Sequence, residues 1–345
     1  MIVENALMTD DGNPSRLFPT KRFDLPNGSC EAYIGSTIGY LDIRWNAMSV
    51  TGLFDDVTEA KAGALDFTVT KAGRVMGAEI SEIDLSKSFE DATRDAILDA
   101  LNSHQILIFP DQDLNKIAQV AFTKRFGAME QHVARNYDGT TFGEVHLVSN
   151  LDPNGKPTAT PRSSGNFFWH TDKSYHDIPS LATILHAITI PPEGGGTQFS
   201  NMHLAYEALP ELMKEKIAGL RAVHSWEASR NNTFNRPATE EQKKERPPVV
   251  HPMVRTHPGT GKKILYIGTH TSHIEGMPVD EGRALLYQLL DFGTRPRFQY
   301  THYWKEGQVV MWDNRCLLHR AAGDFEMDKY PRLLHRTVVR GTKPY

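Results

Sequence analysis

Short segments in which apolar and polar residues alternate recur along most of the chain, separated by Gly and Pro. This pattern predicts strands at 65–69, 105–109, 181–190, 197–200, 298–304, 308–312 and 332–340, and a hairpin over 254–267. Apolar residues at helical spacing predict a helix that Asp91 caps, and further helices at 116–126, at 204–219 with an interruption at Pro210, and at 280–292.

Many short strands with Gly and Pro turns and a few inserted helices predict a mostly β protein with flanking helices. The expected architecture is a double-stranded β-helix, or jelly roll, with the helices at 91–126 and 280–292 outside one sheet. We expect one domain over residues 65–345. Residues 1–64 show no sustained period and are predicted to be an N-terminal extension, either poorly structured or the product of a misassigned start.

Two polar segments are expected to lie at the surface. Residues 152–164, rich in Pro, Thr and Ser, precede the most aromatic stretch of the chain and are predicted to form a mobile lid. Residues 229–248 contain a run of charges and are predicted to be an inserted surface loop with a solvated face.

Composition excludes several classes of protein. With 38 basic and 42 acidic residues and a pI near 6.4, the chain has no basic stripe to bind nucleic acid. Its two cysteines, Cys30 and Cys316, cannot form a disulfide framework or a zinc–thiolate site and fit a reducing compartment. No secretory signal is visible and the apolar runs are too short to span a bilayer, so we expect a cytoplasmic protein that binds no membrane.

The stretch 166–175, Asn-Phe-Phe-Trp-His-Thr-Asp-Lys-Ser-Tyr, is dense in aromatic residues and is interpreted as a buried strand. Alternate side chains of a strand share a face, so His170 and Asp172 are expected to point the same way. An imidazole and a carboxylate held side by side provide two of the three ligands of a facial triad. Such a triad suits ferrous iron and leaves positions open for other ligands.

A His-x-Asp or His-x-Glu motif also arises by chance in a chain with fifteen histidines, and a core or surface histidine is the default interpretation. A second motif of this kind is His273-Ile274-Glu275. It lies close to His319 in sequence and is predicted at a loop-to-helix junction, so we reject it as the triad. His270 and His273 stay candidate pocket residues. His319, after the turn that Asp313 and Asn314 predict, is the candidate third ligand.

The last predicted strand places Arg332, Leu334 and Arg336 on one face. If that face is the interior of the barrel, two guanidinium groups enter an apolar cavity, which is costly unless each meets an anion. A planar guanidinium matches a carboxylate with two parallel hydrogen bonds. The alternative is an edge strand whose arginines face solvent.

Taken in order, these motifs resemble one family. Asn166-x-x-Trp169-His170-x-Asp172, the run 194–197, the turn 312–315 with His319, and Arg332 with Arg336 resemble the iron(II)- and 2-oxoglutarate-dependent dioxygenases related to taurine dioxygenase. Residues 254–263 and 272–276 are most similar to the 2,4-dichlorophenoxyacetate dioxygenase branch. The resemblance covers about residues 65–345.

The resemblance implies a role for each matching residue. It implies that His170, Asp172 and His319 bind Fe(II) and that 2-oxoglutarate chelates the metal. Arg332, Thr197 and Trp312 would form the 2-oxoglutarate pocket. Arg336, with Asn166 and His132, would bind the organic substrate. Two positions depart from the family: Gly196 stands where aspartate is common, and residues 323–331 lengthen the gap before Arg332, which is expected to enlarge a surface turn.

The implied activity is the O2-dependent hydroxylation of a small anionic substrate, with 2-oxoglutarate converted to succinate and CO2. An aryloxyalkanoate such as 2,4-dichlorophenoxyacetate is the expected substrate, and taurine or another alkylsulfonate is the alternative. Relatives imply a homo-oligomer, a dimer or a tetramer. Two other classes of protein are alternatives. A non-catalytic jelly-roll binding protein would be favoured by the loss of a triad ligand, but none is missing. A zinc hydrolase could use the same three ligands but would leave the two arginines unexplained.

Overall fold

The computed structural model describes residues 21–23, 30–32, 67–130, 143–159, 164–233 and 237–345. The chain divides into two compact units, Met1–Ser49 and Val50–Tyr345. In the first, the described residues are the antiparallel pair β1 (Lys21–Phe23) and β2 (Cys30–Ala32). The rest of the predicted extension, residues 1–64, lies outside the described residues, and the domain boundary at residue 65 stays a prediction.

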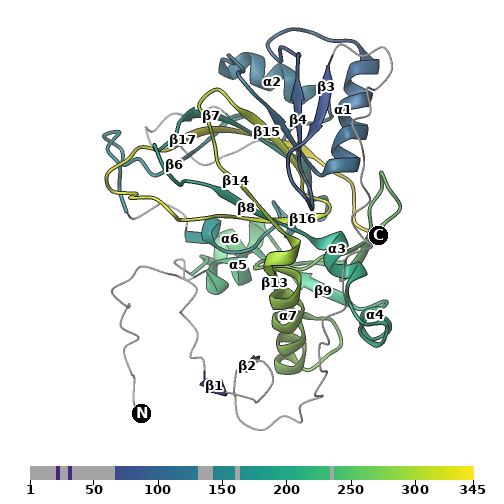
Figure 1. Ribbon diagram of the computed structural model, residues 1–345. Coiled ribbons are helices and arrows are strands. Elements are labelled where there is room, and N and C mark those ends of the chain that lie inside the picture. Colours follow the sequence, from purple (N-terminus) through teal and green to yellow (C-terminus); the bar gives the residue numbers. More distant parts are fainter. Residues whose placement is uncertain (1–20, 24–29, 33–66, 131–142, 160–163, 234–236) are drawn as a thin grey trace. The chain divides into compact units, whose positions relative to one another are not determined.

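The second unit contains strands and helices in alternation (Figure 1). Its strands are β3 (Thr68–Lys71), β4 (Ala78–Ser81), β5 (Ile106–Phe109), β6 (His146–Ser149), β7 (Ser180–Thr189), β8 (Thr197–Asn201), β9 (Arg221–His224), β10 (Val249–Pro252), β11 (Val254–Thr256), β12 (Lys263–Leu265), β13 (Thr271–Ile274), β14 (Gln299–His302), β15 (Val309–Asp313), β16 (Leu317–Ala321) and β17 (Leu333–Arg340). Its α-helices are α1 (Asp91–His104), α2 (Lys116–Lys124), α3 (Met202–Glu207), α4 (Glu211–Ile217), α5 (Trp226–Asn232), α6 (Glu240–Glu245) and α7 (Val279–Gly293).

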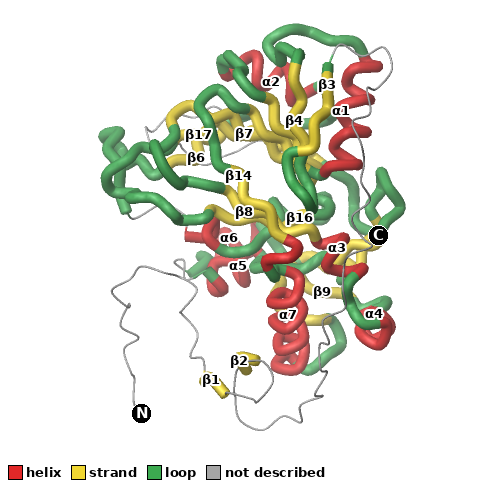
Figure 2. The backbone as a smooth tube through the Cα atoms, in the orientation of Figure 1, coloured by secondary structure: helices red, strands yellow, loops and turns green. Residues whose placement is uncertain are grey.

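The strands form one large sheet and several small ones. The large sheet has the order β3-β4-β5-β15-β7-β17-β6, and a three-stranded sheet has the order β14-β8-β16. A second three-stranded sheet, β10-β9-β13, and the hairpin β11-β12 complete the unit. Pairing is antiparallel except between β4 and β5. Figure 2 shows the strands gathered in the middle and helices on either side, so the prediction of a mostly β protein with helices is confirmed.

The two faces of the large sheet have different partners. Val309 and Met311 of β15 pack with Ala182 and Ile184 of β7 into a core that α1 and α2 cover. The residues that alternate with these four along β15 and β7 point to the opposite face, because side chains alternate along a strand. Trp312 is among these, and it is buried there. This alternation directs the polar and aromatic side chains of the sheet toward the small sheet β14-β8-β16.

The chain passes from one sheet to the other immediately after β15. β15 belongs to the large sheet, whereas β16 pairs with β8 in the small one, so residues Asn314–Cys316 form the connection. In this register His319 lies opposite Phe199. His319 also forms an isolated antiparallel bridge with His170, whose N–H donates to the His319 carbonyl at 3.1 Å and whose carbonyl accepts at 2.8 Å.

The turn between β7 and β8 needs glycine. Gly194 and Gly195 have φ values of +70° and +68°, in the left-handed region that L side chains rarely adopt. A Cβ at Gly194 would lie 2.0 Å from the Asp324 carbonyl oxygen. The turn therefore packs tightly against residues 323–331, the segment that lengthens the gap before Arg332.

Most predicted elements are confirmed to within a few residues. The helix at 204–219 is interrupted at Pro210 as expected, giving α3 and α4. The predicted N-cap of α1 was wrong. Glu90 is the N-cap and Asp91 is the first helical residue. The Asp91 carboxylate pairs with Arg94 and Arg125 instead of capping the helix. The packing of α7 was also wrong, because it contacts β13 and α3 rather than the large sheet.

The predicted surface loop at 229–248 was wrong as well. It is built on α5 and α6, with residues 234–236 outside the description. Both helices have N-terminal caps: the Ser225 side chain accepts the N–H of Ala228, and Thr239 and Gln242 form a reciprocal capping box. The Thr-x-x-Gln spacing is the sequence signal that would have predicted α6.

No helix in the described part of the chain combines the length and the apolar character that crossing a bilayer requires. The predicted lid at 152–164 is only partly described. Its first residues form a turn, in which Asp152 accepts the N–H groups of Asn154 and Lys156, and Leu151 bridges to Pro157. Its mobility stays a prediction.

Candidate active site

The stretch 166–175 is not a strand, which corrects the sequence interpretation. Ser164–Phe167 forms a short 3-10 helix, only His170 pairs with another segment, and the chain then turns, with a φ of 55° at Lys173. The physical reason lies in Asn314. Its carbonyl accepts the Thr171 hydroxyl at 2.7 Å, and its side-chain oxygen accepts the Asp172 N–H at 3.4 Å. These contacts replace the hydrogen bonds that a neighbouring strand would provide.

The structure nevertheless brings His170, Asp172 and His319 together. Their ligand atoms all lie within 4.8 Å of one another, and all three side chains are buried. Nε2 of His170 is 4.0 Å from Asp172 Oδ1, and Nε2 of His319 is 3.9 Å from Asp172 Oδ2. Three donors that face one point in this way could hold a metal ion, and a two-histidine, one-carboxylate set fits iron(II).

The hydrogen bonds of His170 fix which nitrogen faces the other ligands. Nδ1 lies 2.7 Å from the Phe168 carbonyl oxygen, which can only accept, so Nδ1 carries the proton. The lone pair is therefore on Nε2, directed toward Asp172. Burial lowers the pKa of both His170 and His319, which keeps these imidazoles neutral. Neutral imidazole is the form that binds a metal.

Asp172 is held as a carboxylate by its neighbours. Burial alone would raise its pKa, but Arg336, followed by His319 and His170, outweighs that effect, and the pKa lies well below its usual range. Nη2 of Arg336 is 2.6 Å from Oδ1. The Thr183 hydroxyl donates to Oδ2. One oxygen of the carboxylate thus faces a cation from β17 and the other a hydroxyl from β7.

A chain of polar contacts links Asp172 to the turn between the two sheets. Nδ2 of Asn314 donates to the Thr183 hydroxyl at 2.9 Å, and Oδ1 of Asn314 accepts from Nε1 of Trp312 at 3.1 Å. The Trp312 ring packs against His319, with 4.8 Å between ring centroids. Sequence reasoning identified Asn314 only as a turn residue and missed Thr183, because a threonine within a strand carries no distinguishing signal.

A second group of potential ligands, His257, Asp313 and Cys316, also has its ligand atoms within 4.8 Å. Nδ1 of His257 accepts the N–H groups of Gly259 and Thr260, so Nε2 carries the proton and donates to Asp313 at 2.9 Å. Burial raises the pKa of the Cys316 thiol well above its ordinary value. Both nitrogens of the His257 imidazole are already hydrogen-bonded and the Cys316 thiol is protonated, so this group does not suit a metal.

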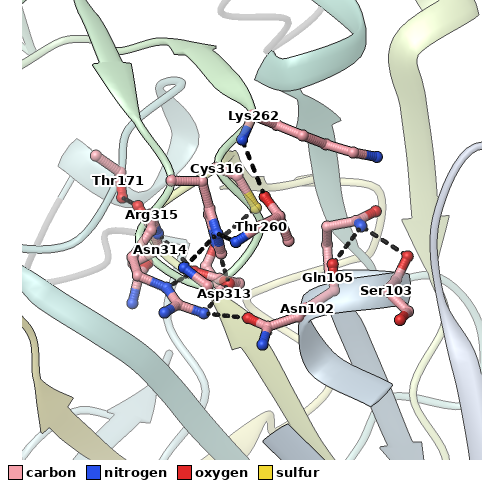
Figure 3. A network of polar contacts seen from close by, with 12 residues as sticks. Asn102, Ser103, Gln105, Thr171, Thr260, Lys262, Asp313, Asn314, Arg315 and Cys316 are labelled. Atoms are coloured by element: carbon pink, nitrogen blue, oxygen red, sulfur yellow. Dashed lines mark hydrogen bonds and ion pairs between the residues drawn. The ribbon is translucent and has the colours of Figure 1, made fainter. Parts of the chain in front are cut away.

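The second group instead braces the turn that carries Asn314. Arg315 binds both oxygens of Asp313, at 2.8 and 2.6 Å, and also donates to Asn102 of α1 at 2.9 Å. Figure 3 shows Asp313, Arg315 and Asn102 joined in this way, with Thr171 on the other side of Asn314. The network fixes the connection between β15 and β16 and hence the position of Asn314.

A cavity of about 600 Å³ opens onto the triad. The predicted site residues that line it are Asn166, His170, Asp172, Thr197, Trp312, His319, Arg332 and Arg336. His132 lies outside the described residues. Of the two candidate pocket histidines, His270 is in the wall, whereas His273 is on β13 and is not. The alternative, in which this part of β17 is an edge strand whose arginines face solvent, is wrong.

Arg332 is one of the arginines that line this cavity. It is buried, its Nε donates to the Gly195 carbonyl at 2.9 Å, and burial lowers its pKa to about 10. Among the described residues no carboxylate forms an ion pair with it. A buried guanidinium without a paired carboxylate is well suited to an anionic ligand. Thr197, close by in β8, accepts a hydrogen bond from Nε1 of Trp304 at 3.0 Å.

Residues 323–331 do more than lengthen a surface turn, which corrects the sequence expectation. Gly323, Phe325 and Met327 line the cavity, and Asn150 holds the segment through the carbonyls of Met327 and Tyr330. The sequence carried no signal for this, because the contacts come from a residue far away along the chain.

Comparison with known proteins gives a consistent result. The model of the family described as "Taurine catabolism dioxygenase TauD, TfdA family" matches residues 67–338. The chain is 38% identical over 250 residues to the alpha-ketoglutarate-dependent 2,4-dichlorophenoxyacetate dioxygenase of Burkholderia sp. strain RASC, which covers 70% of this chain and 84% of that protein. It is 33% identical over 261 residues to the (S)-phenoxypropionate/alpha-ketoglutarate-dioxygenase of Sphingobium herbicidovorans, covering 74% and 89%.

A solved structure agrees with these relatives. The crystal structure of AAD-2 in complex with Mn(II) and N-oxalylglycine superimposes with a TM-score of 0.73 at 35% sequence identity. The match covers 81% of this chain and 98% of that one.

Proposed function

The chain belongs to the TauD/TfdA family of iron(II)- and 2-oxoglutarate-dependent dioxygenases, and on that premise we propose that it hydroxylates a small aryloxyalkanoate carboxylate. The observation that carries the proposal is the convergence of His170, Asp172 and His319 on one point in the wall of a cavity that also contains Arg332 and Arg336. The identity to dioxygenases named for 2,4-dichlorophenoxyacetate and phenoxypropionate supports the aryloxyalkanoate class.

We assign the iron ligands to His170, Asp172 and His319. The fit rests on the tautomer of His170 and on the charge of Asp172, since both leave a lone pair directed into the group. Iron bound there supplies the activation of O2, coupled to the conversion of 2-oxoglutarate to succinate and CO2. The residues of this chain contribute the binding, the orientation and the charge balance around that reaction.

The 2-oxoglutarate pocket is assigned to Arg332, Thr197 and Trp312. Arg332 is buried and without a paired carboxylate, so the distal carboxylate of 2-oxoglutarate would compensate its charge. The Thr197 hydroxyl accepts from Trp304 and keeps its own proton to donate to the same carboxylate. Trp312 lines the same cavity, and its ring packs against that of His319.

The organic substrate is assigned to Arg336, Asn166 and His132. Arg336 and Asn166 line the cavity, whereas His132 stays a prediction outside the described residues. With the substrate carboxylate on Arg336, the neighbouring carbon would be the one presented to the metal. Hydroxylation of an aryloxyacetate there gives a hemiacetal, which collapses to a phenol and glyoxylate without further oxidant.

The finer features of the fold and of the assembly also belong to this proposal. We assign the sheets β3-β4-β5-β15-β7-β17-β6 and β14-β8-β16 to a double-stranded β-helix within a domain over residues 65–345. The match of the family model to residues 67–338 supports that extent. The cytoplasmic location and the homo-oligomeric state stay predictions.

A panel of anionic compounds tests the function directly. The enzyme with Fe(II), 2-oxoglutarate and O2 is offered phenoxyacetate, 2,4-dichlorophenoxyacetate, 2-phenoxypropionate, taurine and a linear alkylsulfonate, and succinate is measured with and without each compound. We expect the aryloxyalkanoates to stimulate succinate formation and to yield the phenol. Stimulation by taurine or the alkylsulfonate alone, with release of sulfite, would favour the alternative substrate class.

A further inference from the structure

Helices α5 and α6 place three side chains in the cavity wall that the proposed function does not use. Trp226 begins α5, Arg230 follows one turn later, and Arg246 comes directly after α6. All three line the cavity that opens onto the triad. The two helices lie against each other, since Lys243 of α6 pairs with Glu227 of α5 at 2.8 Å. We call Trp226, Arg230 and Arg246 the Trp226 wall.

Both arginines stack on the tryptophan. The guanidinium carbon of Arg246 is 4.6 Å from the centroid of the Trp226 ring, and that of Arg230 is 4.8 Å away. A guanidinium that lies over an aromatic ring can still donate hydrogen bonds through the N–H groups in its own plane. In the part of the chain that the structure describes, no carboxylate forms an ion pair with Arg246. Its charge is therefore held in place by an aromatic ring and not compensated by an acid.

Among the residues that the structure describes, the cavity wall has an excess of positively charged side chains. Its cationic residues are Lys173, Arg230, Arg246, Arg320, Arg332 and Arg336, and its carboxylate is that of Asp172. Asp172 is bound to Arg336, and Lys173 is bound at 2.9 Å to Glu130, which lies outside the wall. The proposed 2-oxoglutarate position accounts for Arg332. Arg246 is then a cation of the wall whose charge is compensated neither by a carboxylate of the described residues nor by the proposed cosubstrate.

Tyr175 relates this wall to the triad. Its hydroxyl has a raised pKa, mainly because it is buried, and the charges of Asp172, Arg336 and Arg246 all act on it. Tyr175 lines the same cavity, and its ring centroid lies 4.9 Å from that of His270, which lies 5.7 Å from that of His170. The Trp226 wall and the triad therefore border one cavity.

We propose that the Trp226 wall is a second anion-binding subsite for the organic substrate, with Arg246 as its anion donor, so that the enzyme prefers aryloxyalkanoates carrying an additional anionic group on the ring. This inference rests on the proposed function. Arg336 takes the carboxylate beside the reacting carbon, and the opposite end of the aryl ring reaches the wall. A carboxylate or sulfonate there meets a guanidinium whose orientation is already fixed, which limits the entropy lost on binding.

Three substrates that differ at one ring position test the subsite: phenoxyacetate, 4-carboxyphenoxyacetate and 4-carbamoylphenoxyacetate. The carboxylate and the carboxamide have nearly the same shape, so their difference reports charge. Calorimetric titration of the full chain loaded with Mn(II) and 2-oxoglutarate measures binding without turnover. Phenol and succinate formation with Fe(II) and O2 then gives kcat and KM. We expect the carboxylate to bind at least tenfold more tightly than the carboxamide.

Variants of the wall separate this role from a structural one. Arg246→Gln should bring the ratio of the two affinities close to one, and Arg246→Lys, which keeps the charge but not the planar fork, should retain part of the preference. The matched control is Lys244→Gln, a change of the same charge at an exposed position of α6, and it should leave the ratio unchanged.

The outcomes are distinguishable. Equal affinity for carboxylate and carboxamide in the parent, or an unchanged ratio in Arg246→Gln, overturns the subsite. Preferential binding of the dianion without any phenol or succinate supports the subsite and contradicts the proposed activity. Turnover of phenoxyacetate without a preference for the ring carboxylate supports the activity and contradicts the subsite.

Discussion

Arg336 lies 2.6 Å from Asp172, a cation of β17 against a carboxylate of the triad. The contact joins two roles that sequence reasoning treated separately, since Arg336 was assigned to the organic substrate and Asp172 to the metal. Arg336, which we propose to bind the substrate carboxylate, therefore also helps to keep the proposed metal ligand Asp172 ionised. Arg332 comes directly before β17 and precedes Arg336 in the sequence by roughly 13 Å of strand rise, so we expect each arginine to bind its own anion.

We predict that Arg336→Ala weakens the organic substrate strongly and leaves 2-oxoglutarate binding nearly intact. A lost charge-assisted contact corresponds to about 1.5–3 kcal/mol, or roughly ten- to a hundredfold in affinity. Succinate should then form slowly and without matching product, which is measured by quantifying both in one reaction. Arg336→Lys is the comparison, because it keeps the charge beside Asp172. A raised 2-oxoglutarate requirement with an unaffected substrate would reverse the assignment of the two arginines.

The triad makes a prediction about both binding and turnover. His170→Ala and His319→Ala should abolish turnover while the fold is retained, because each removes one of the neutral imidazoles that face Asp172. The anaerobic complex with iron and 2-oxoglutarate should show a weak visible charge-transfer band in the parent and none in the variants. His273→Ala is the control, since His273 lies outside the cavity wall. Full activity in either triad variant would exclude the assignment.

Arg332 should control affinity for 2-oxoglutarate. Arg332→Gln removes the buried guanidinium, and the affinity for 2-oxoglutarate should fall at least about tenfold with little change in metal affinity. Equilibrium titration of the Mn(II)-loaded protein with 2-oxoglutarate measures this. Arg340→Gln, at the exposed end of β17, the strand that follows Arg332, is the matched control. If 2-oxoglutarate binds as before, the cosubstrate occupies another part of the cavity.

The buried His302 of β14 makes the stability of the protein depend on pH. Burial lowers its pKa to about 4, against about 6.5 in an unfolded chain. The unfolded state therefore binds the proton more readily, so the contribution of His302 to stability is complete above about pH 6.5 and is lost as the pH falls toward 4. His302→Gln should reduce the loss of unfolding free energy by up to about 1.4 kcal/mol per pH unit in this window, measured by urea unfolding. An unchanged pH slope would show that His302 binds its proton equally well in the folded and the unfolded state.

The sequence predicted which side chains converge at the site better than it predicted the backbone that carries them. The triad was identified from residue types and order, which survive any error in secondary structure. The strand at 166–175 was wrong because Phe167, Phe168 and Trp169 give the apolar density of a buried strand. The turn that replaces it depends on Asn314, which is 142 residues away from Asp172 in the sequence. No local pattern contains that information.

The walls of the cavity were the least predictable part. Arg246 was interpreted as part of a solvated charge run, whereas the structure packs α6 against α5 and places Arg246 in the cavity wall. Phe325 and Met327 belong to a segment whose course is set by Asn150. In each case a tertiary contact brings the side chain to the site, and no sequence pattern indicates it. The proposed metal ligands, in contrast, belong to a motif that is visible in the sequence.

Thr183 provides the last prediction, which tests whether a residue that is not itself a proposed metal ligand positions the metal site through Asp172. Its hydroxyl donates to Asp172 and accepts from Asn314, so Thr183→Val removes both contacts at almost constant volume. Partners of this kind typically contribute about 10- to 100-fold to metal affinity, and we expect a loss in that range when Mn(II) binding is followed by electron paramagnetic resonance. Thr183→Ser should restore most of it, because the hydroxyl is kept. Thr337→Val is the matched control: that threonine is equally buried, but its hydroxyl contacts Thr123 on the face covered by α2. If both valine variants lose metal affinity equally, the effect is general destabilisation, and Asp172 does not need the hydroxyl for its orientation.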